Sequence, residues 1–386
     1  KKHLDIFLMG LGTNTLGYSN PYVDREVKKV ISNGNMSSLN SKEEIILAEK
    51  LIDINPWAHS VRFTRSGGEA NAVAVRIARA YSGKDNIAIC GYHGWHDWYL
   101  SANLNKNDNL DSHLIKNLKV LGVPKILKNT VYPFEYNNLK QLETIVKNKN
   151  IGIIKMEVER DIKPNKNFLK EIKKIYLKNK IILIFDECTS GFRETFGGLH
   201  LKYKIYPDIC IYGKALGNGY AINAIVGKKE IMNSVKSTFI SSTFWTERIG
   251  PVAAIKTLDI MRKTESWKQI SSTGQEIKKR WSEISLSNSL KIDIMGLDAL
   301  PKFNFISKHH LAYKTYISQE MLKNNILASN LVYTSLSHDK KKLQKYFDVL
   351  NKVFKIIKKC ENEKENIYNL LETDVSIQGI RYNEKK

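Results

Sequence analysis

Short apolar runs alternate with segments of helical periodicity from Leu4 to Val226, and this alternation constrains the fold more than any other feature. Strands are expected at Leu4–Met9, Val61–Arg65, Ile87–Cys90, Thr130–Phe134, Ile151–Met156, Ile181–Phe185, Ile209–Tyr212 and Ile222–Val226. Helices are expected between them, at Tyr22–Ser32, Lys42–Asp53, Ala70–Tyr81, Leu139–Val146 and Phe168–Leu177. Such alternation predicts an α/β fold with a mostly parallel sheet covered by helices on both faces. Ligands of these sheets bind at the carboxyl ends of the strands.

The pattern changes after about Thr246. A long helical stretch is expected from Pro251 towards Trp281. It is followed by strands near Leu290–Ile294, Lys302–Ile306 and Leu331–Leu336, and by helices at His310–Lys323 and His338–Cys360. We therefore expect a small α+β domain after the large one.

The expected organisation is an N-terminal segment (1–40), a large ligand-binding domain (41–265), a small C-terminal domain (266–372) and a poorly ordered tail (373–386). The chain opens on three polar residues and enters an apolar run at once. For that reason we expect the N-terminal segment to lack an upstream part.

The formal net charge of +22 raises the question of a polyanionic partner. Of the 61 Lys and Arg side chains only 11 are Arg, and Asn and Ile are also abundant. These residues are encoded by AT-rich codons, so compositional drift explains the excess of lysine. The lysines are also scattered, as at Lys28-Lys29, Lys173-Lys174 and Lys278-Lys279. We expect solvated helix faces and no nucleic-acid partner.

Four cysteines, Cys90, Cys188, Cys210 and Cys360, lie far apart and form no C-x-x-C pair. This spacing fits a reducing compartment and argues against a disulfide framework or a structural zinc site. No apolar run reaches the roughly 18–20 residues of a membrane span. We therefore expect a cytoplasmic protein without membrane contact.

Two loops after expected strands could contact a ligand. Gly67-Gly68 follows a strand and opens a helix, which suits a phosphate but is equally common in a tight turn. The loop Cys90–Asp97 is rich in aromatic and histidine side chains. It is open to three interpretations: an ordinary loop, a zinc site that uses its histidines, and an aromatic platform for a flat cofactor.

Two further features follow buried strands. Asp186 and Glu187 end the most apolar strand, where carboxylates are costly unless a cation meets them. A metal role of the kind found in NTPases is disfavoured because no G-x-x-x-x-G-K-[ST] motif occurs. Lys214 lies in a glycine-rich turn after the next strand, either as a solvated charge or as a Schiff-base lysine.

Together these parts are what pyridoxal phosphate needs. A phosphate cup, a ring platform, an Asp for the pyridine nitrogen and a Lys for the aldehyde all lie at strand ends. The sequence therefore predicts a pyridoxal 5'-phosphate site.

Three segments carry a family resemblance. Val61–Ala70 resembles V-R-F-x-x-S-G-T-E-A, Ile184–Arg193 resembles I-F-D-E-V-x-T-G-F-R, and Gly213–Gly219 resembles G-K-x-x-G-x-G. From about Phe7 to Lys358 the chain resembles the class III (subgroup II) pyridoxal-phosphate aminotransferases, in particular glutamate-1-semialdehyde aminomutase and its aminotransferase relatives. The resemblance implies the fold-type I architecture.

The resemblance also implies roles for individual residues. Lys214 would be the Schiff-base lysine and proton shuttle, and Asp186 would pair with the pyridine nitrogen. The other residues expected around the cofactor are Ser66, Gly67, Gly68, Tyr92, His93, Glu157, Cys188 and Thr243. Thr243 would reach the phosphate of a neighbouring subunit, which implies a homodimer with shared active sites. Arg193, Ser38 and Arg160 are the candidates for substrate contact, and no metal is expected.

The implied activity is transfer of an amino group between an amino donor and a carbonyl acceptor, such as a semialdehyde, keto acid or keto sugar. Analogy suggests surface polysaccharide synthesis as a setting. The alternatives are an aminomutase, which moves the amino group within one skeleton, and a non-catalytic homologue that binds a polyanion.

Overall fold

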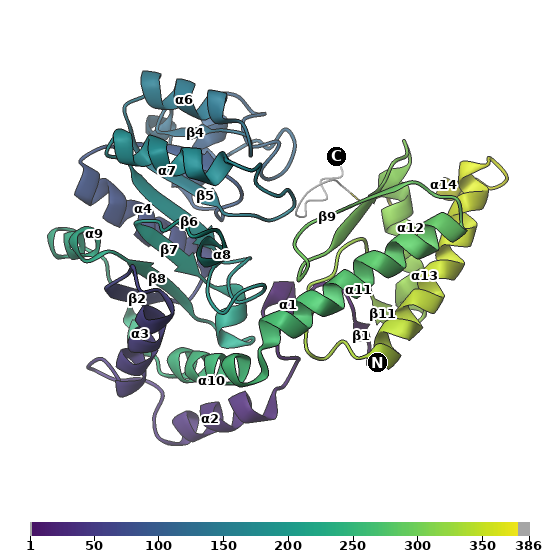
Figure 1. The fold of residues 1–386 in the computed structure, drawn as a ribbon, viewed down its shortest axis with the longest axis horizontal. Helices are drawn as coiled ribbons and strands as arrows, with labels where there is room; N and C mark the ends of the chain where they lie inside the picture. Colours follow the sequence, from purple (N-terminus) through teal and green to yellow (C-terminus); the bar gives the residue numbers. More distant parts are fainter. Residues whose placement is uncertain (1, 377–386) are drawn as a thin grey trace. The chain divides into compact units, whose positions relative to one another are not determined.

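The computed structural model describes residues 2–376, and its internal contacts divide the chain into two compact units (Figure 1). The sheet unit is Ser19–Thr264; the described part of the C-terminal unit comprises residues 2–18 and 265–376. The segment 1–40 expected from the sequence is thus divided between the two units. Lys1 and residues 377–386 of the expected tail lie outside the described residues.

A seven-stranded sheet forms the centre of the sheet unit (Figure 1). Its spatial order is β2 (Ser60–Thr64), β8 (Asn223–Gly227), β7 (Ile209–Tyr212), β6 (Ile182–Glu187), β5 (Ile151–Glu157), β3 (Asn86–Cys90) and β4 (Val131–Pro133). The strands from β7 to β4 are parallel, whereas β8 is antiparallel to both of its neighbours. The expected α/β fold with a mostly parallel sheet is confirmed.

Helices surround this sheet, and two of them have clear start or stop signals in the sequence. They are α2 (Pro21–Ser32), α3 (Lys42–Ile54), α4 (Gly67–Ser82), α5 (Asp97–Leu100), α6 (Leu139–Asn148), α7 (Phe168–Lys178), α8 (Leu199–Tyr203), α9 (Lys229–Met232) and α10 (Ile249–Thr264). Helix α3 begins with a capping box, in which Ser41 accepts from the backbone of Glu44 and Glu44 accepts from that of Ser41. Helix α4 ends at Gly83, which adopts the left-handed conformation that favours glycine.

Burial on both faces explains why the central strands are almost continuously apolar. All residues of β6 are buried, and Ile182 and Ile184 pack in one cluster with Ala70 and Val73 of α4. Because side chains alternate along a strand, Leu183 and Phe185 point to the opposite face. The α4 face therefore also carries Asp186 at the end of the strand.

The C-terminal unit is built around aromatic side chains. Its helices are α1 (Met9–Gly12), α11 (Ser266–Ser287), α12 (His310–Lys323), α13 (Lys340–Glu361) and α14 (Ile367–Leu370), with the strand pairs β1 (Leu4–Asp5) and β11 (Ile326–Leu327), and β9 (Ile292–Met295) and β10 (Lys302–Phe305). Its core contains Trp281, Phe303, Phe305, Tyr346 and Phe354. The buried Trp281 indole is satisfied because its Nε1 donates to the Tyr346 hydroxyl at 2.9 Å.

Three expectations for this unit are wrong in detail. The expected strand Leu331–Leu336 forms only a single bridge to Lys302, because Val332 and Thr334 donate to loop carbonyls instead. The first strand ends at Asp5. The Asp5 carboxylate accepts hydrogen bonds from the backbone N–H groups of residues 7–9, and these bonds turn the chain. The long helix expected from Pro251 is broken at Glu265, which has a φ of 47°.

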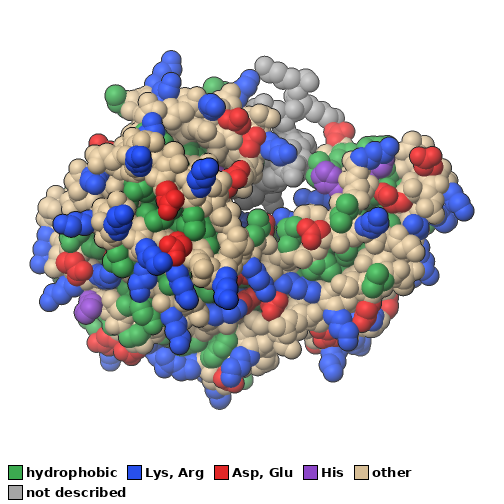
Figure 2. All heavy atoms as spheres, turned by 45° about the horizontal axis from the view of Figure 1, so that its top comes forward, with side chains coloured by type: hydrophobic (Ala, Val, Ile, Leu, Met, Phe, Trp, Pro, Cys, Tyr) green, Lys and Arg blue, Asp and Glu red, His purple; other side chains and the backbone are tan. Residues whose placement is uncertain are grey.

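The charged side chains are spread over the surface. Figure 2 shows Lys and Arg distributed over the visible face, with Asp and Glu between them. Within the described range 2–376, no helix combines the length and the apolar character needed to cross a membrane.

Candidate active site

The predicted catalytic residues meet at one edge of the sheet. Glu157 at the end of β5 is in register with Asp186 at the end of β6. Asp186 is in turn in register with Ile211 of β7, and Lys214 follows that strand in the short helix η3 (Lys214–Gly217). Neighbouring parallel strands thus place their carboxyl ends side by side, as expected for the ligand-binding edge of such a sheet.

Asp186 is a buried carboxylate surrounded by donors. Its Oδ2 lies 2.9 Å from His93 Nδ1 and 3.7 Å from Lys155 Nζ, and its Oδ1 accepts from the backbone N–H of Cys188 at 3.1 Å. Burial alone would raise the pKa of Asp186. The positive charge of Lys155 and the bond from His93 outweigh it and hold the pKa well below its usual value. Asp186 is therefore ionised, as a partner of a protonated pyridine nitrogen must be.

Lys214 is held by the loop that follows Asp186. Its Nζ donates to the hydroxyl of Thr189 at 2.6 Å. Gly213 directly before it has no room for a side chain, because a Cβ there would collide with Asn223 Nδ2 and lie 3.1 Å from Cys188 Sγ. The backbone at Lys214 is thus packed against the β6 loop and β8.

The glycine pair lies at the start of α4 on the same face. Ser66 caps this helix, its exposed hydroxyl accepting from the Glu69 amide at 3.4 Å. A Cβ on Gly67 would lie 3.6 Å from Cys188 Sγ, and one on Gly68 would lie 2.9 Å from the His96 ring. The start of α4 therefore lies beside Cys188, and its backbone amides and the helix dipole favour an anion there.

The aromatic loop after β3 completes the arrangement. The Tyr92 amide donates to Glu157 Oε2 at 3.1 Å, and the partly exposed Tyr92 ring packs edge-to-face on Tyr99. Its neighbour His93 is buried and bonded to Asp186. Burial lowers the pKa of His93, so the imidazole is neutral and donates its Nδ1 proton. Glu157 therefore holds the loop, and His93 holds the carboxylate.

The residues fit pyridoxal phosphate. The structure offers amides at a helix start for the phosphate, an ionised carboxylate for the ring nitrogen, and Cys188 beside both Gly67 and Gly213. Lys214, the only expected Schiff-base lysine, follows Gly213. These groups come from three separate segments of the chain and gather on one face of the sheet.

The remaining predicted residues do not join this group. Thr243, which begins η5 (Thr243–Thr246), and Ser38, in the loop after α2, are both exposed. Arg160 lies closer, its guanidinium 3.7 Å from Glu157. Arg193 is fully buried and its Nε donates to the Thr189 carbonyl at 2.6 Å. This placement gives no support to the predicted substrate contact of Arg193, which instead fastens the loop that holds Lys214.

The zinc interpretation of the aromatic loop is not supported, because within residues 2–376 the ligand atoms of His93, His96 and Asp97 do not converge as a metal site requires. A second group, Glu187, His200 and Cys210, has its ligand atoms close together. Trp57 Nε1 donates to His200 Nε2 at 3.0 Å, so the proton on Nδ1 is the one given to Glu187 at 2.8 Å. Hydrogen bonds within the core thus account for this cluster.

Sequence reasoning missed three residues of the site: Thr189, Asn223 and Lys155. Thr189 and Asn223 are common polar residues, and only the fold brings them to Lys214 and Cys188. Lys155 carries a visible signal, since it interrupts the apolar run of β5 and is completely buried.

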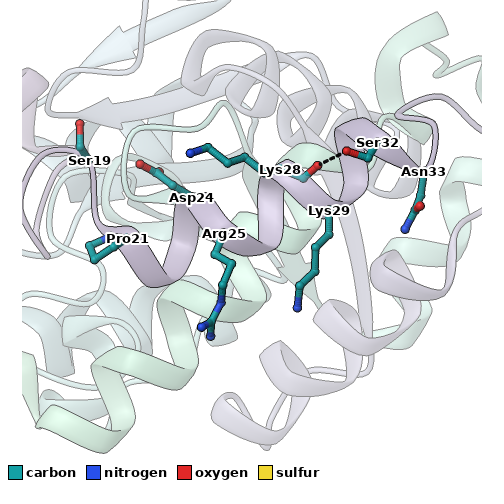
Figure 3. Close-up of a pocket in the computed structure, with 8 residues that line it drawn as sticks. All are labelled: Ser19, Pro21, Asp24, Arg25, Lys28, Lys29, Ser32 and Asn33. Carbon is teal, nitrogen blue, oxygen red and sulfur yellow. Dashed lines mark hydrogen bonds between the residues drawn. The ribbon is translucent and has the colours of Figure 1, made fainter.

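A hollow of about 620 Å³ lies elsewhere on the sheet unit, along α2 (Figure 3). It is lined by Ser19, Pro21, Asp24, Arg25, Lys28, Lys29, Ser32 and Asn33. None of the predicted site residues lines it. Asp24 of this lining accepts from the hydroxyl of Tyr220, just after the lysine turn, at 2.9 Å.

Comparison with known proteins identifies the family of this chain. The sequence profile of the family described as "Aminotransferase class-III" matches residues 1–320, and the chain belongs to this family. The family uses pyridoxal phosphate, so the protein is a pyridoxal-phosphate-dependent enzyme of the aminotransferase class.

Two similar proteins illustrate the range of the family. A 3-aminobutyryl-CoA aminotransferase of Cloacimonas acidaminovorans is 30% identical over 336 residues, covering 83% of this chain and 76% of the relative. A glutamate-1-semialdehyde 2,1-aminomutase of Wigglesworthia glossinidia brevipalpis is 30% identical over 384 residues, covering 92% and 87%. An omega-transaminase from Sphaerobacter thermophilus has the same fold, with a TM-score of 0.83 at 20% identity over 91% of this chain and 86% of that chain.

Proposed function

We propose that this enzyme transfers an amino group from an amino donor to a separate carbonyl compound, with Lys214 and Asp186 as its catalytic residues. The observation that carries this proposal is the convergence of the Lys214 turn, the ionised Asp186 and the Gly67-Gly68 helix start on one face of the sheet. Bound pyridoxal phosphate supplies an aldehyde that captures amines and a ring that withdraws electrons.

Lys214 Nζ is the group that moves the proton. With the cofactor bound, it would take a proton from the carbon that carries the amino group of the donor and deliver it to the aldehyde carbon of the cofactor. When the acceptor is aminated, it would move a proton in the opposite direction, to the carbonyl carbon of the acceptor. Thr189 supports this role, because its hydroxyl fixes Lys214 Nζ at 2.6 Å while Arg193 fixes the Thr189 carbonyl. A positioned amine of this kind contributes about 10²–10⁴-fold in general acid–base catalysis.

Asp186 would hold the ring nitrogen of the bound cofactor by its negative charge. Its fixed donors, His93 Nδ1 and the Cys188 amide, leave the carboxylate oriented before any ligand arrives. Such preorganisation avoids a rearrangement of dipoles during the reaction.

Arg160 is our candidate for the recognition of a substrate carboxylate. Its side chain is 29% exposed, and its guanidinium lies 3.7 Å from Glu157, which also holds the Tyr92 loop. The change Arg160→Gln is expected to raise KM for acidic substrates with little change in kcat. Ser38, exposed in its loop, is the second candidate for substrate contact.

We further propose a homodimer in which Thr243 serves the phosphate site of the other subunit. Arg65 Nη2 donates to the carbonyls of Trp245 and Glu247 at 3.0 and 2.9 Å, and Trp245 Nε1 donates to Glu69 at 2.7 Å. These bonds fix the exposed Thr243 segment beside the start of α4. Sedimentation should give about twice the chain mass of 44.3 kDa, whereas a monomer would contradict the proposal.

An aminomutase is the second candidate, because several relatives that are 28–33% identical carry that name. The experiment that separates the two uses ¹⁵N-labelled amino donors with an unlabelled carbonyl acceptor. Mass spectrometry should find ¹⁵N in the aminated acceptor. Rearrangement of glutamate-1-semialdehyde without transfer of label to any acceptor would favour the aminomutase.

A further inference from the structure

Gly68 is the second residue of α4, and another segment of the chain fills the space beside it. A Cβ on Gly68 would lie 2.9 Å from His96 Cδ2 and 3.0 Å from His96 Nε2. Contacts this short force atoms apart, so no side chain fits at residue 68 while His96 stays in place. The imidazole therefore occupies the volume that a side chain at this position would fill, and the ring edge that carries Nε2 faces the helix start.

This arrangement coincides with a departure from the family motif. The motif that Val61–Ala70 resembles, V-R-F-x-x-S-G-T-E-A, has threonine where this chain has Gly68. A threonine would bring a hydroxyl donor to the first turn of α4. In this chain the residue at that position has no side chain, and His96 brings an imidazole to the same place. One polar group has thus been exchanged for another at the start of the helix.

The groups that meet here are donors without acceptors. The amides of Glu69 and Ala70 donate to the hydroxyl and the carbonyl of Ser66. Those of Gly67 and Gly68 have no hydrogen-bond acceptor among residues 2–376, and the ring nitrogens of the half-buried His96 have no partner there either. Two backbone amides and an imidazole N–H can together serve the oxygens of one phosphate group.

The loop around His96 is fixed from several sides. The Trp95 ring lies on the His96 ring at a centroid distance of 4.8 Å and an angle of 34°. The amides of Tyr99 and Leu100 donate to the His96 carbonyl at 2.9 and 3.2 Å. Gly94 has a φ of 95°, and a Cβ on it would lie 3.1 Å from the Gly68 Cα. The imidazole is therefore held against the helix start before any ligand binds.

We propose that His96 is a phosphate-binding residue of the cofactor site, in which its Nε2–H donates to a phosphate oxygen held by the amides of Gly67 and Gly68. In this chain Gly68 makes room for the imidazole, and His96 supplies the side-chain donor that residue 68 lacks. The inference rests on the proposed position of the phosphate at the start of α4.

The test compares pyridoxal phosphate with pyridoxal, which has the same ring and aldehyde but no phosphate. Fluorescence quenching of the apoprotein gives both dissociation constants. His96→Leu fills the space without a donor, so the dissociation constant of pyridoxal phosphate should rise about tenfold, while that of pyridoxal stays unchanged. His59→Leu, which replaces an exposed histidine of the same unit, is the matched control and should change neither value. An equal loss for both ligands, or no loss for pyridoxal phosphate, would overturn the proposal.

A side-chain swap tests whether His96 and residue 68 share one place. Gly68→Thr alone places its side chain against His96 and should weaken the binding of pyridoxal phosphate. His96→Ala alone removes the donor and should weaken binding as well. The double variant has both the hydroxyl and the room for it, so it should bind more tightly than either single variant. His96→Gln keeps an N–H group near the position of Nε2 and should retain most of the affinity. A double variant that binds no better than the weaker single variant, with normal circular dichroism, would refute the exchange.

Asp186→Asn separates failure of this inference from failure of the site. Asp186 is assigned to the ring, so Asp186→Asn should weaken the binding of both ligands. If it does so while His96→Leu changes neither dissociation constant, the role of His96 is refuted and the site stands. If neither variant changes the binding of either ligand, the proposed site itself is wrong.

Discussion

The two units of the molecule bury different kinds of side chain. In the described residues, every buried Lys, Arg, Asp or Glu belongs to the sheet unit: Lys155, Glu159, Asp186, Glu187, Arg193 and Asp208. The C-terminal unit buries aromatic rings instead, with Trp281 at its centre. Ionised groups in an apolar interior lower stability unless they are partnered. Of the buried charges, Asp186 belongs to the candidate site, whereas Glu187 and Arg193 hold neighbouring segments in place, and the C-terminal core is built from apolar packing.

The largest expected effect is on Lys214. Lys214→Ala removes the group that moves the proton and should lower kcat by about 10³-fold or more. Steady-state transamination assays measure this loss. Lys178→Ala, which truncates an exposed lysine of α7, is the matched control and should behave as the wild type. Activity within tenfold of wild type in Lys214→Ala would remove this residue from the mechanism.

A substitution that creates a large cavity in the C-terminal unit should affect stability rather than chemistry. Trp281→Ala removes a fully buried indole and should lower the free energy of unfolding by about 3–5 kcal/mol. Urea denaturation followed by tyrosine fluorescence and circular dichroism measures the change. Well below the transition, the absorbance of bound cofactor should match that of the wild type. Loss of the cofactor absorbance in the folded Trp281→Ala variant would contradict the separate roles of the two units.

The two glycines next to Cys188 provide a sharper comparison within the sheet unit. Gly213→Ala forces a methyl group into Asn223 and should destabilise the fold by about 1–3 kcal/mol and weaken cofactor binding. Gly67→Ala places its methyl group in ordinary contact, 3.6 Å from Cys188 Sγ, and should cost less than about 0.5 kcal/mol. Equal effects of the two changes on thermal stability would show that the packing at the lysine turn is described wrongly.

The smallest effect concerns pH. Burial lowers the pKa of His113 from 6.5 to about 4. Between these values the unfolded chain binds a proton that the folded chain does not, so stability falls as pH decreases from about 6.5 to 4. The slope for one group is at most about 1.4 kcal/mol per pH unit. His113→Gln retains an acceptor for the Gly91 amide, 3.2 Å away in the wild type, and should have a shallower slope in urea midpoints.

The sequence predicted the parts of the molecule that depend on local pattern. The apolar run before Asp186 and the glycines around Lys214 identify a buried strand and a turn, and the alternation of strands with helices predicts a mostly parallel sheet. What it could not predict depends on contacts between distant segments. The hydrogen bond that Lys214 donates to Thr189 forms only after β6 and β7 pair, and so does the buried environment of Arg193.

The break at Glu265 illustrates a second limit. Apolar periodicity continues on both sides of this residue, so the pattern alone predicts one helix. Only its left-handed backbone separates α10 from α11, and this is also where the two units divide.

Our central claim is that Lys214 is the residue that holds the cofactor aldehyde, and borohydride reduction tests it most directly. The purified enzyme is loaded with pyridoxal phosphate, reduced, digested and analysed by peptide mass spectrometry. The account predicts a single pyridoxyl group on Lys214 Nζ and none on the buried Lys155. A pyridoxyl group on another lysine, with Lys214 unmodified, would contradict the account.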